Sequence, residues 1–460
     1  MKIKPALLKC ALVASMGGLL FGFDTAVISG AEGILKEIYA SRYMELSNFL
    51  GTKSFWHGFT VASALIGTII GALIFGKPAD RYGRKKMLIV LGILYLISAA
   101  GSALSFNWSF FVIMRFIGGL AVGGSSVVAP MYNAEISPAR YRGRMVALTQ
   151  FNIVLGIMLA FLSNYLIKSL DLGEVSYRWM FGVEIIPALA FTILMIFNPR
   201  SPRWLVSKSL LDEAKKVMGR LGADTENIDK EIGGIVASLK SDRETLSEKF
   251  FQIKYIKPIL LAVTIAAFNQ LSGINAVLYY APRVFTMAGF GEDAAFLSSV
   301  VIGFVNLIFT MSALLIIDHF GRKKLMLYGS IGYIVSLVTI AITFFVNGKE
   351  FSQAGGTVVL VGLIFFAASH SFGQGAVIWV FISEIFPNKV RARGQALGSF
   401  THWFMAAAIS WSFPVLAEIS GGFIFSFYAF CMVFQLLWVL FKMPETKGIP
   451  LEELQKKLGL

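Results

Sequence analysis

Three ionisable side chains lie inside long apolar stretches of the sequence. Asp24, Arg115 and Glu184 each fall within about 20 mostly apolar residues, where an unpaired charge is costly, so each is a functional candidate. Each lies within about two helical turns of the same predicted end, so the three share a depth. Protonating Asp24 would release Arg115 to Glu184, and deprotonation would recapture it. The alternative is a static ion pair that only fixes helix packing.

A second group consists of amide, aromatic and histidine side chains in otherwise apolar stretches. Such residues suit a pocket for a small hydroxylated solute, because hydroxyls donate and accept hydrogen bonds and C–H faces are apolar. The candidates are Gln150, Asn269, Gln270, Asn275, Asn306, Trp379, His402 and Trp403, with Tyr279 and Tyr280 placed to close the outer side. The alternative is that the amides form hydrogen bonds between helices and that the tryptophans are ordinary packing or interface residues. The role of His402 stays open: it could bind a hydroxyl, titrate near neutrality or simply pack.

The elements that position these residues are predicted to be transmembrane helices. Of 460 residues, 56% are hydrophobic and only 15% are charged, which excludes a soluble protein. A spanning helix needs about 20 apolar residues, because the hydrocarbon core is roughly 30 Å thick. Twelve stretches qualify, near 7–30, 54–76, 87–106, 110–131, 145–167, 178–198, 256–281, 294–318, 324–346, 357–383, 394–417 and 421–443.

The positive charges are concentrated at alternate ends of these stretches. The net charge is +14, and basic clusters occur at 2–9, 81–86, 140–144, 322–324 and 389–393. By the positive-inside rule these loops are cytoplasmic, and an even number of helices places both termini there. The cations therefore indicate orientation in a plasma (inner) membrane, and no nucleic-acid partner is expected.

An internal repeat divides the chain into two halves. Residues 80–86 and 318–324 share the pattern Asp-x-x-Gly-Arg-Lys-Lys, and two Glu-Ile-x-Pro segments each have an arginine seven residues after the glutamate. We therefore expect an all-α membrane protein of two pseudo-symmetric six-helix bundles. The repeated charges are Asp80, Arg84, Glu135 and Arg142 in the first half, and Asp318, Arg322, Glu384 and Arg391 in the second.

The long polar stretch 199–255 is predicted to be a cytoplasmic linker with short amphipathic helices. Ser209 is placed to cap a helix with Asp212 three residues on, Gly222 is placed to end it, and a second helix fits 228–239. The expected domains are therefore 1–198, the linker 199–255, 256–443 and a cytoplasmic tail 444–460.

These motifs together resemble the sugar porter branch of the major facilitator superfamily. The resemblance rests on the repeated loops, on Gly17–Gly30 with Gly22-Phe-Asp24, on Gln270–Tyr280, and on Pro444-Glu-Thr-Lys-Gly448. It implies the twelve-helix fold, with Asp24 as the usual proton-coupling residue. It also implies sugar contacts from Gln150, Gln270, Asn275, Asn306 and Trp379. The repeated charges would form a latch that closes the cytoplasmic gate while the site faces outward.

The sequence departs from the family pattern at several of these positions. Asn269 stands where many sugar porters have a second glutamine, and His402 and Ala406 stand where amides are usual. Arg200 replaces the family's glutamate in the cytoplasmic segment after the sixth predicted helix. The identity of the sugar therefore stays open, and one cytoplasmic charge contact must be rearranged.

The leading hypothesis is a monomeric proton–monosaccharide symporter. The alternatives are a facilitative sugar uniporter and a non-transporting membrane sugar sensor, which the short tail disfavours. No phosphate-binding loop, metal-ligand spacing or nucleophile–base set is present in the sequence, so no enzyme activity, metal or cofactor is expected apart from the coupling proton.

Overall fold

The computed structural model describes residues 4–138, 141–222, 228–245, 248–348, 350–387, 389–449 and 451–458. The side chains of residues 240–245, 318, 451–452 and 456–457 lie outside this description.

The first half of the chain is helical throughout its described membrane segments. Its helices are α1 (Pro5–Ile38), α2 (Ala40–Ser47), α3 (Lys53–Ile74), α4 (Gly76–Tyr82), α5 (Arg84–Ala103), α6 (Trp108–Ile136), α7 (Arg142–Lys168), α8 (Ser176–Gly182) and α9 (Ile185–Phe197). The linker contributes α10 (Pro202–Ser207), α11 (Leu211–Leu221) and α12 (Ile228–Thr245).

The second half has the same character but carries more interrupted helices. Its helices are α13 (Ile256–Leu271), α14 (Ile274–Tyr279), α15 (Ala281–Met287), α16 (Glu292–Phe320), α17 (Arg322–Asn347), α18 (Gln353–His370), α19 (Ala376–Ile385), α20 (Arg391–Ile419), α21 (Gly421–Phe441) and α22 (Leu451–Leu458). A π-helical turn, Ser371–Gly375, joins α18 to α19.

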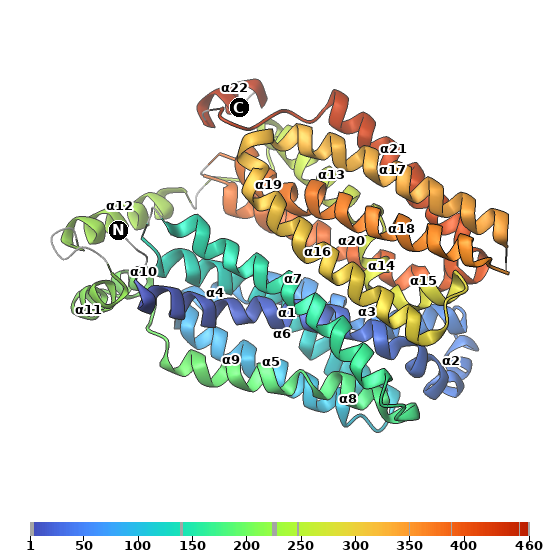
Figure 1. Cartoon of the computed structure of the whole chain (residues 1–460). Helices are drawn as coiled ribbons and strands as arrows, with labels where there is room; N and C mark the ends of the chain where they lie inside the picture. The colour runs from blue at the N-terminus through green and yellow to red at the C-terminus, as the bar shows by residue number, and fades with distance from the viewer. Residues whose placement is uncertain are drawn as a thin grey trace.

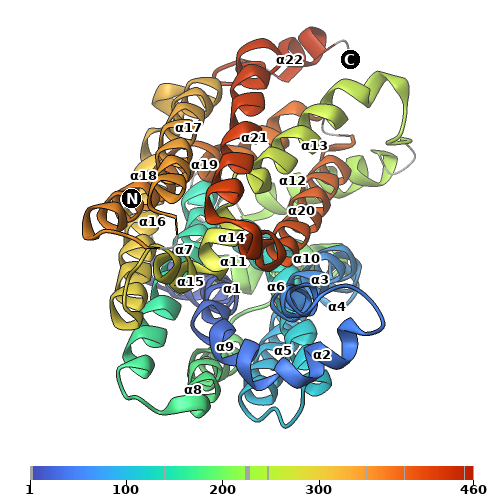
Figure 2. The same ribbon diagram turned by 90° about the vertical axis from the view of Figure 1, so that its right-hand side faces the viewer.

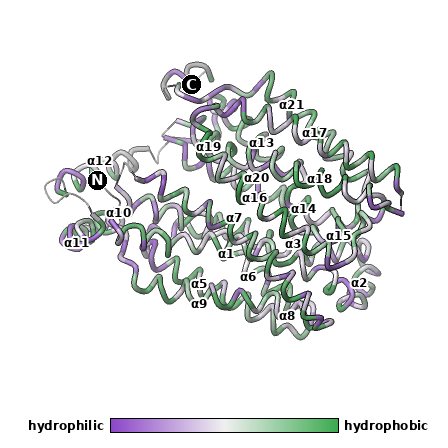
Figure 3. The backbone as a smooth tube through the Cα atoms, in the orientation of Figure 1, coloured by the Kyte–Doolittle hydropathy of each residue, from purple (hydrophilic) through white to green (hydrophobic). Residues whose placement is uncertain are grey.

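Eleven helices or helix runs in the described residues are long and apolar enough to cross a membrane. The twelfth predicted span corresponds to α20, which is 29 residues long but carries two arginines and several polar side chains. Its polarity suits a helix that faces the transport pathway rather than lipid. Figure 3 shows apolar residues along the bundles and polar residues gathered at their two ends. The prediction of twelve transmembrane helices is confirmed.

The two halves form neighbouring bundles, as Figure 1 shows. Within the first half, α1 packs against α7, and α6 packs against both α3 and α5. The halves meet where α3 packs against α20 and where α7 packs against α16. At Gly58 on α3 an added Cβ would lie 2.0 Å from the carbonyl oxygen of Trp411 on α20, so only glycine allows this backbone approach.

The linker helices lie at the same end of the molecule as α22 (Figure 1). Gly222 ends α11 in the left-handed conformation with φ 103°, as predicted. The predicted cap at Ser209 is wrong, because Ser209 has φ 62° and the helix begins after Leu210 without a side-chain cap. Outside the membrane spans, the hydrogen bond from Lys215 to Asp229 raises the pKa of the lysine and ties α11 to α12.

Candidate transport site

The first candidate centre is a buried ion pair between α1 and α6. The Nη1 atom of Arg115 lies 2.5 Å from Oδ1 of Asp24, and Nη2 donates to the backbone carbonyl of Asp24 at 3.1 Å. Both side chains are about 2% exposed, so the pair is shielded from solvent. The guanidinium also lies over the ring of Phe181, 5.0 Å from its centroid. The structure thus brings together Asp24 and Arg115 as the sequence predicts.

Glu184 lies beside this pair but is not bonded to it. It sits at the junction of α8 and α9, is 1% exposed, and is close enough to Asp24 and Arg115 to interact electrostatically. Among the described residues neither of its carboxylate oxygens has a hydrogen-bond partner. An unpaired buried carboxylate is unfavourable, so Glu184 is a ready second partner for the arginine.

Gly118 on α6 provides the space for the Asp24 carboxylate. A Cβ at this position would lie 2.3 Å from the hydroxyl of Ser98 and 3.3 Å from Oδ1 of Asp24. The absence of a side chain therefore lets α6 carry Arg115 close to α1.

The second candidate centre is built around a break in the helix that begins the second half. The chain turns at Gly273, which has φ 84°, between α13 and α14. Any Cβ there would also collide with the ring of Tyr428, since its nearest atom would be 2.4 Å away. The turn lets Nδ2 of Asn275 donate to Oε1 of Gln270 at 2.9 Å. Broken helices of this kind commonly carry the binding site in transporters.

Amide and aromatic side chains surround Gln270. Its Nε2 atom donates to Oδ1 of Asn269 at 2.8 Å and lies 3.3 Å from the ring nitrogens of His402 on α20. The ring of His402 lies 5.0 Å from that of Trp379 and 4.9 Å from that of Trp403. These residues therefore form one polar and aromatic cluster.

Two features suit this cluster to a sugar. Trp379 is 37% exposed, so part of an aromatic side chain is accessible beside a set of buried amides. Phe21 on α1 lies 5.4 Å from Trp403, which brings the first half against the cluster. Hydroxyls and apolar C–H faces find complementary partners in such an arrangement.

Asn306 and Gln150 are placed differently from the other predicted sugar contacts. Oδ1 of Asn306 accepts a hydrogen bond from Ser371 at 2.7 Å and another from Thr310 at 3.3 Å, so it joins α16 to the π-helical turn. Gln150 is half-buried on α7 and makes no hydrogen bond to the Gln270 cluster in the described part of the chain.

The structure adds a polar core in the second half that the sequence reasoning missed. Gln374 in the π-helical turn is fully buried and donates to Gln435 on α21, which in turn donates to Ser330 on α17 at 2.8 Å. His370 lies 2.6 Å from the hydroxyl of Tyr333. Gln374 and Gln435 are amides in apolar segments, the same sequence signal that marks Gln270.

The two predicted gate tyrosines lie at the contact between the halves. Tyr279 on α14 is 2% exposed and lies within electrostatic range of Asp24 and Arg115. Tyr280 is fully buried, donates to the carbonyl of Ser410 at 3.1 Å, and stacks on Phe413 with centroids 4.6 Å apart. The gate segment therefore contacts α20 and reaches the Asp24 centre.

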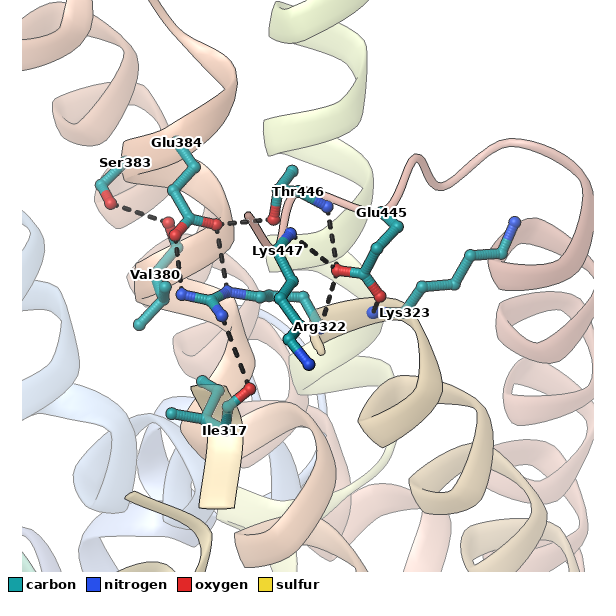
Figure 4. A network of polar contacts seen from close by, with 9 residues as sticks. All are labelled: Ile317, Arg322, Lys323, Val380, Ser383, Glu384, Glu445, Thr446 and Lys447. Carbon is teal, nitrogen blue, oxygen red and sulfur yellow. Dashed lines mark hydrogen bonds and ion pairs between the residues drawn. The ribbon is translucent and has the colours of Figure 1, made fainter. Parts of the chain in front are cut away.

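At the opposite end, the second half has a connected charge network, shown in Figure 4. Arg322 forms a two-point contact with Glu384, at 2.8 and 3.1 Å. The same carboxylate accepts from Thr446 at 2.6 Å. Glu445 accepts from the backbone amides of Arg322 and Lys323 at 2.9 and 3.1 Å, which caps α17.

The first half has a related arrangement with different partners. Arg84 lies 2.7 Å from Asp80 and 2.9 Å from Glu135, and Ser201 donates to the same glutamate. Arg200, at the position corresponding to Glu445, instead lies 3.4 Å from Glu213 on the surface of the linker. The rearranged contact that the sequence predicts is therefore a partly exposed pair with α11.

Two of the predicted latch arginines do not join these networks. Arg142 donates to the carbonyl of Ala134 at 3.2 Å, and Arg391 donates to the carbonyl of Phe386 at 3.3 Å. Neither contacts a carboxylate within the described residues, so in this conformation these two arginines are bonded only to backbone carbonyls of their own half. The side chain of Asp318, the eighth predicted member, lies outside the described residues.

Comparison with known proteins gives a consistent result. The family described as "Sugar (and other) transporter" matches residues 10–458. The D-xylose-proton symporter of Escherichia coli is 36% identical, covering 96% of this chain and 94% of its own. The arabinose-proton symporter of Bacillus subtilis is 35% identical, covering 98% of this chain and 94% of its own.

Solved structures are similar over nearly the whole chain. The inward open conformation of the E. coli xylose transporter XylE superposes with a TM-score of 0.85 at 34% identity, covering 98% of this chain and 99% of that one. The same transporter bound to 6-bromo-6-deoxy-D-glucose gives a TM-score of 0.80, covering 99% and 100%. With both centres built on a shared twelve-helix frame, this integral membrane protein belongs to the sugar transporter family of the major facilitator superfamily.

Proposed function

We propose that this chain imports a monosaccharide together with a proton by alternating access. The observation that carries the proposal is the position of Arg115, which is bonded to buried Asp24, while buried Glu184 beside it has no hydrogen-bond partner among the described residues. The D-xylose-proton and arabinose-proton symporters among its relatives support the same activity.

Proton coupling rests on exchange of the arginine between the two carboxylates. Deprotonated Asp24 holds Arg115, as in the arrangement described above. Protonation of Asp24 removes its charge and releases the arginine to Glu184, because a buried cation needs a charged partner. The exchange moves α1 relative to α6, α8 and α9, so the proton acts on helix packing.

Sugar binding rests on the Gln270 cluster in the second half. The sugar contacts Gln270, Asn275 and Trp379. Around these three residues lie Asn269, His402 and Trp403. Gln150 completes the pocket from the first half as the halves close. Asn306 supports the pocket through Ser371. Proton and sugar help one another by favouring a common conformation, without direct contact. Tyr279, buried near Asp24, is the physical link between the two centres.

The conformation described here is the inward-facing one in this proposal. Contacts at the outer end join the two halves, including Lys168 with Glu292 at 2.5 Å and Trp411 with the carbonyl of Phe55 at 2.9 Å. The ion pairs of Arg84 and Arg322 instead connect residues of the same half. In the outward-facing state these charges form the cytoplasmic latch. The transporter is a monomer with both termini in the cytoplasm.

The test is uptake of a labelled sugar panel into proteoliposomes, with and without an imposed proton gradient. A monosaccharide that accumulates against its gradient only when protons flow inward supports the proposal. Uptake that equilibrates and ignores the proton gradient would establish a facilitative uniporter instead. Binding without any uptake would favour a sensor.

A further inference from the structure

A second group of ionisable residues, two of them buried and one half-buried, lies at the outer end, away from both centres. Glu32 on α1 is 4% exposed, and His57 on α3 is fully buried. Nε2 of His57 lies 2.8 Å from Oε2 of Glu32, and Nη1 of Arg283 on α15 lies 3.8 Å from the same oxygen. We call Glu32, His57 and Arg283 the outer ion cluster.

The cluster crosses the boundary between the two halves. Glu32 and His57 belong to the first half, whereas Arg283 belongs to the second. Figure 2, which views the outer end, shows α14 and α15 at the centre between the two bundles. Arg283 follows the gate residue Tyr280 by three positions, so its contact with Glu32 holds the gate segment against α1.

Aromatic rings line the buried Glu32 and His57 part of the cluster, whereas the Arg283 side chain is 17% exposed. The ring of His57 lies 5.8 Å from that of Tyr43 on α2 and 6.5 Å from that of Tyr280. Both tyrosines are at most 1% exposed. Charge pairs in such surroundings are screened much less than surface pairs.

The ion pair between Lys168 and Glu292, which also crosses the outer end, is more exposed. In the pair between Lys168 and Glu292 the side chains are 28% and 69% exposed. Exposed pairs contribute little to stability, typically below about 1 kcal/mol. The pair between Arg283 and Glu32, at 17% and 5% exposed, is therefore the better shielded of the two ion pairs between the halves at this end.

We propose that Glu32 and Arg283 form a clasp that holds the outer gate closed, with His57 orienting the glutamate. Opening the site outward requires α15 to leave α1, which separates Arg283 from Glu32. The clasp thus sets the ratio of outward-open to outward-closed molecules. It rests on the alternating access of the proposed function, but not on proton coupling.

The experiment measures the distance between spin labels at Leu50 and Ile419, both exposed near the outer end. The background has Cys10 and Cys431 replaced, and Arg283→Met is compared with Arg283→Lys and with Lys168→Met as the exposed-pair control. We expect Arg283→Met to raise the outward-open to outward-closed ratio about tenfold or more. Arg283→Lys should keep most of the wild-type distribution, because it keeps the charge. Lys168→Met should change the ratio less than twofold.

A double-mutant cycle separates the clasp from general loss of folding. Glu32→Gln should raise the ratio as Arg283→Met does, and the double variant should add little to either change, because each removes the same interaction. An unchanged distance distribution in folded Arg283→Met protein, or additive effects in the double variant, would overturn the proposal. The distance measurement requires no proton gradient. A wild-type protein that fails in proton-driven uptake would therefore count against the symport proposal and not against the clasp.

Discussion

The guanidinium of Arg115 is bonded to both the carboxylate and the backbone carbonyl of Asp24, and the two residues lie 91 positions apart on different helices. Only the carboxylate contact depends on protonation, because the backbone carbonyl stays available when Asp24 is neutral. The arginine can therefore change its charged partner without losing all contact with α1. Glu184, buried and unpartnered beside the pair, is the group that can receive it.

Asp24→Asn should separate sugar exchange from proton-driven accumulation. The amide keeps the shape of the protonated acid but cannot hold the arginine by charge. We expect sugar binding and exchange to persist, with accumulation driven by a proton gradient abolished. The measurement is counterflow and gradient-driven uptake in the same proteoliposomes. Asp293→Asn, an exposed acid at the start of α16, is the matched control. A variant that still concentrates sugar would remove Asp24 from coupling.

Gln270→Ala and Trp379→Ala should each weaken sugar binding by about tenfold or more. Loss of a buried hydrogen-bond partner costs roughly 1–3 kcal/mol, and 1.4 kcal/mol corresponds to a factor of ten. Gln270→Ala also leaves the amide of Asn275 without its acceptor. Equilibrium binding of the transported sugar checks both variants against Gln353→Ala and Trp179→Ala, which change exposed residues. Wild-type affinity in both folded variants would place the sugar elsewhere.

Gly118→Ala should destabilise the first half by about 1–3 kcal/mol, the usual range for an overpacked core. The added methyl group would lie 2.3 Å from the Ser98 hydroxyl, so Ser98→Ala in the same chain should recover part of the loss. Thermal unfolding in detergent measures the coupling, and proton-driven uptake reports displacement of Asp24. If Gly118→Ala costs the same with and without the Ser98 hydroxyl, the proposed clash is wrong.

Replacing Glu135 and Glu384 with glutamine should shift the population several-fold toward the inward-facing state. These carboxylates hold Arg84 and Arg322 at the cytoplasmic end, and in our proposal the outward-facing state needs them to join the halves. Distances between labels on the cytoplasmic ends of α6 and α19 provide the measurement. Glu231→Gln on α12 serves as the control because its side chain is exposed. A distribution identical to wild type would exclude the latch.

Sequence patterns were sufficient for the membrane frame and for part of each centre. Apolar length predicts each span, and the repeated loops predict two halves, because both follow from local composition and from the duplication of motifs. The three buried charges were identified because an ionisable side chain in lipid is rare. The family resemblance supplied Gln270 and Asn275, but their mutual hydrogen bond depends on the turn at Gly273.

Other features required the tertiary structure. Glu32 lay outside the predicted first span, which ended at residue 30, whereas α1 continues to Ile38 and buries it. Ser209 has the composition of a helix cap but adopts a left-handed conformation, because its neighbours Leu205, Val206 and Ala214 pack into one core. Arg142 and Arg391 share the spacing of the latch, yet each bonds a carbonyl.

The sequence by itself determined that the chain crosses the membrane about twelve times, in two related halves, and that three ionisable side chains lie inside apolar spans, where they are costly without a function. These properties follow from hydropathy and residue type along the chain. The tertiary structure decided which charge pairs with which: Asp24 rather than Glu184 for Arg115, and Arg283 for Glu32. Such pairings depend on which helices are neighbours in a given conformation. A transporter sequence must encode more than one conformation, so no single set of contacts can be read from it.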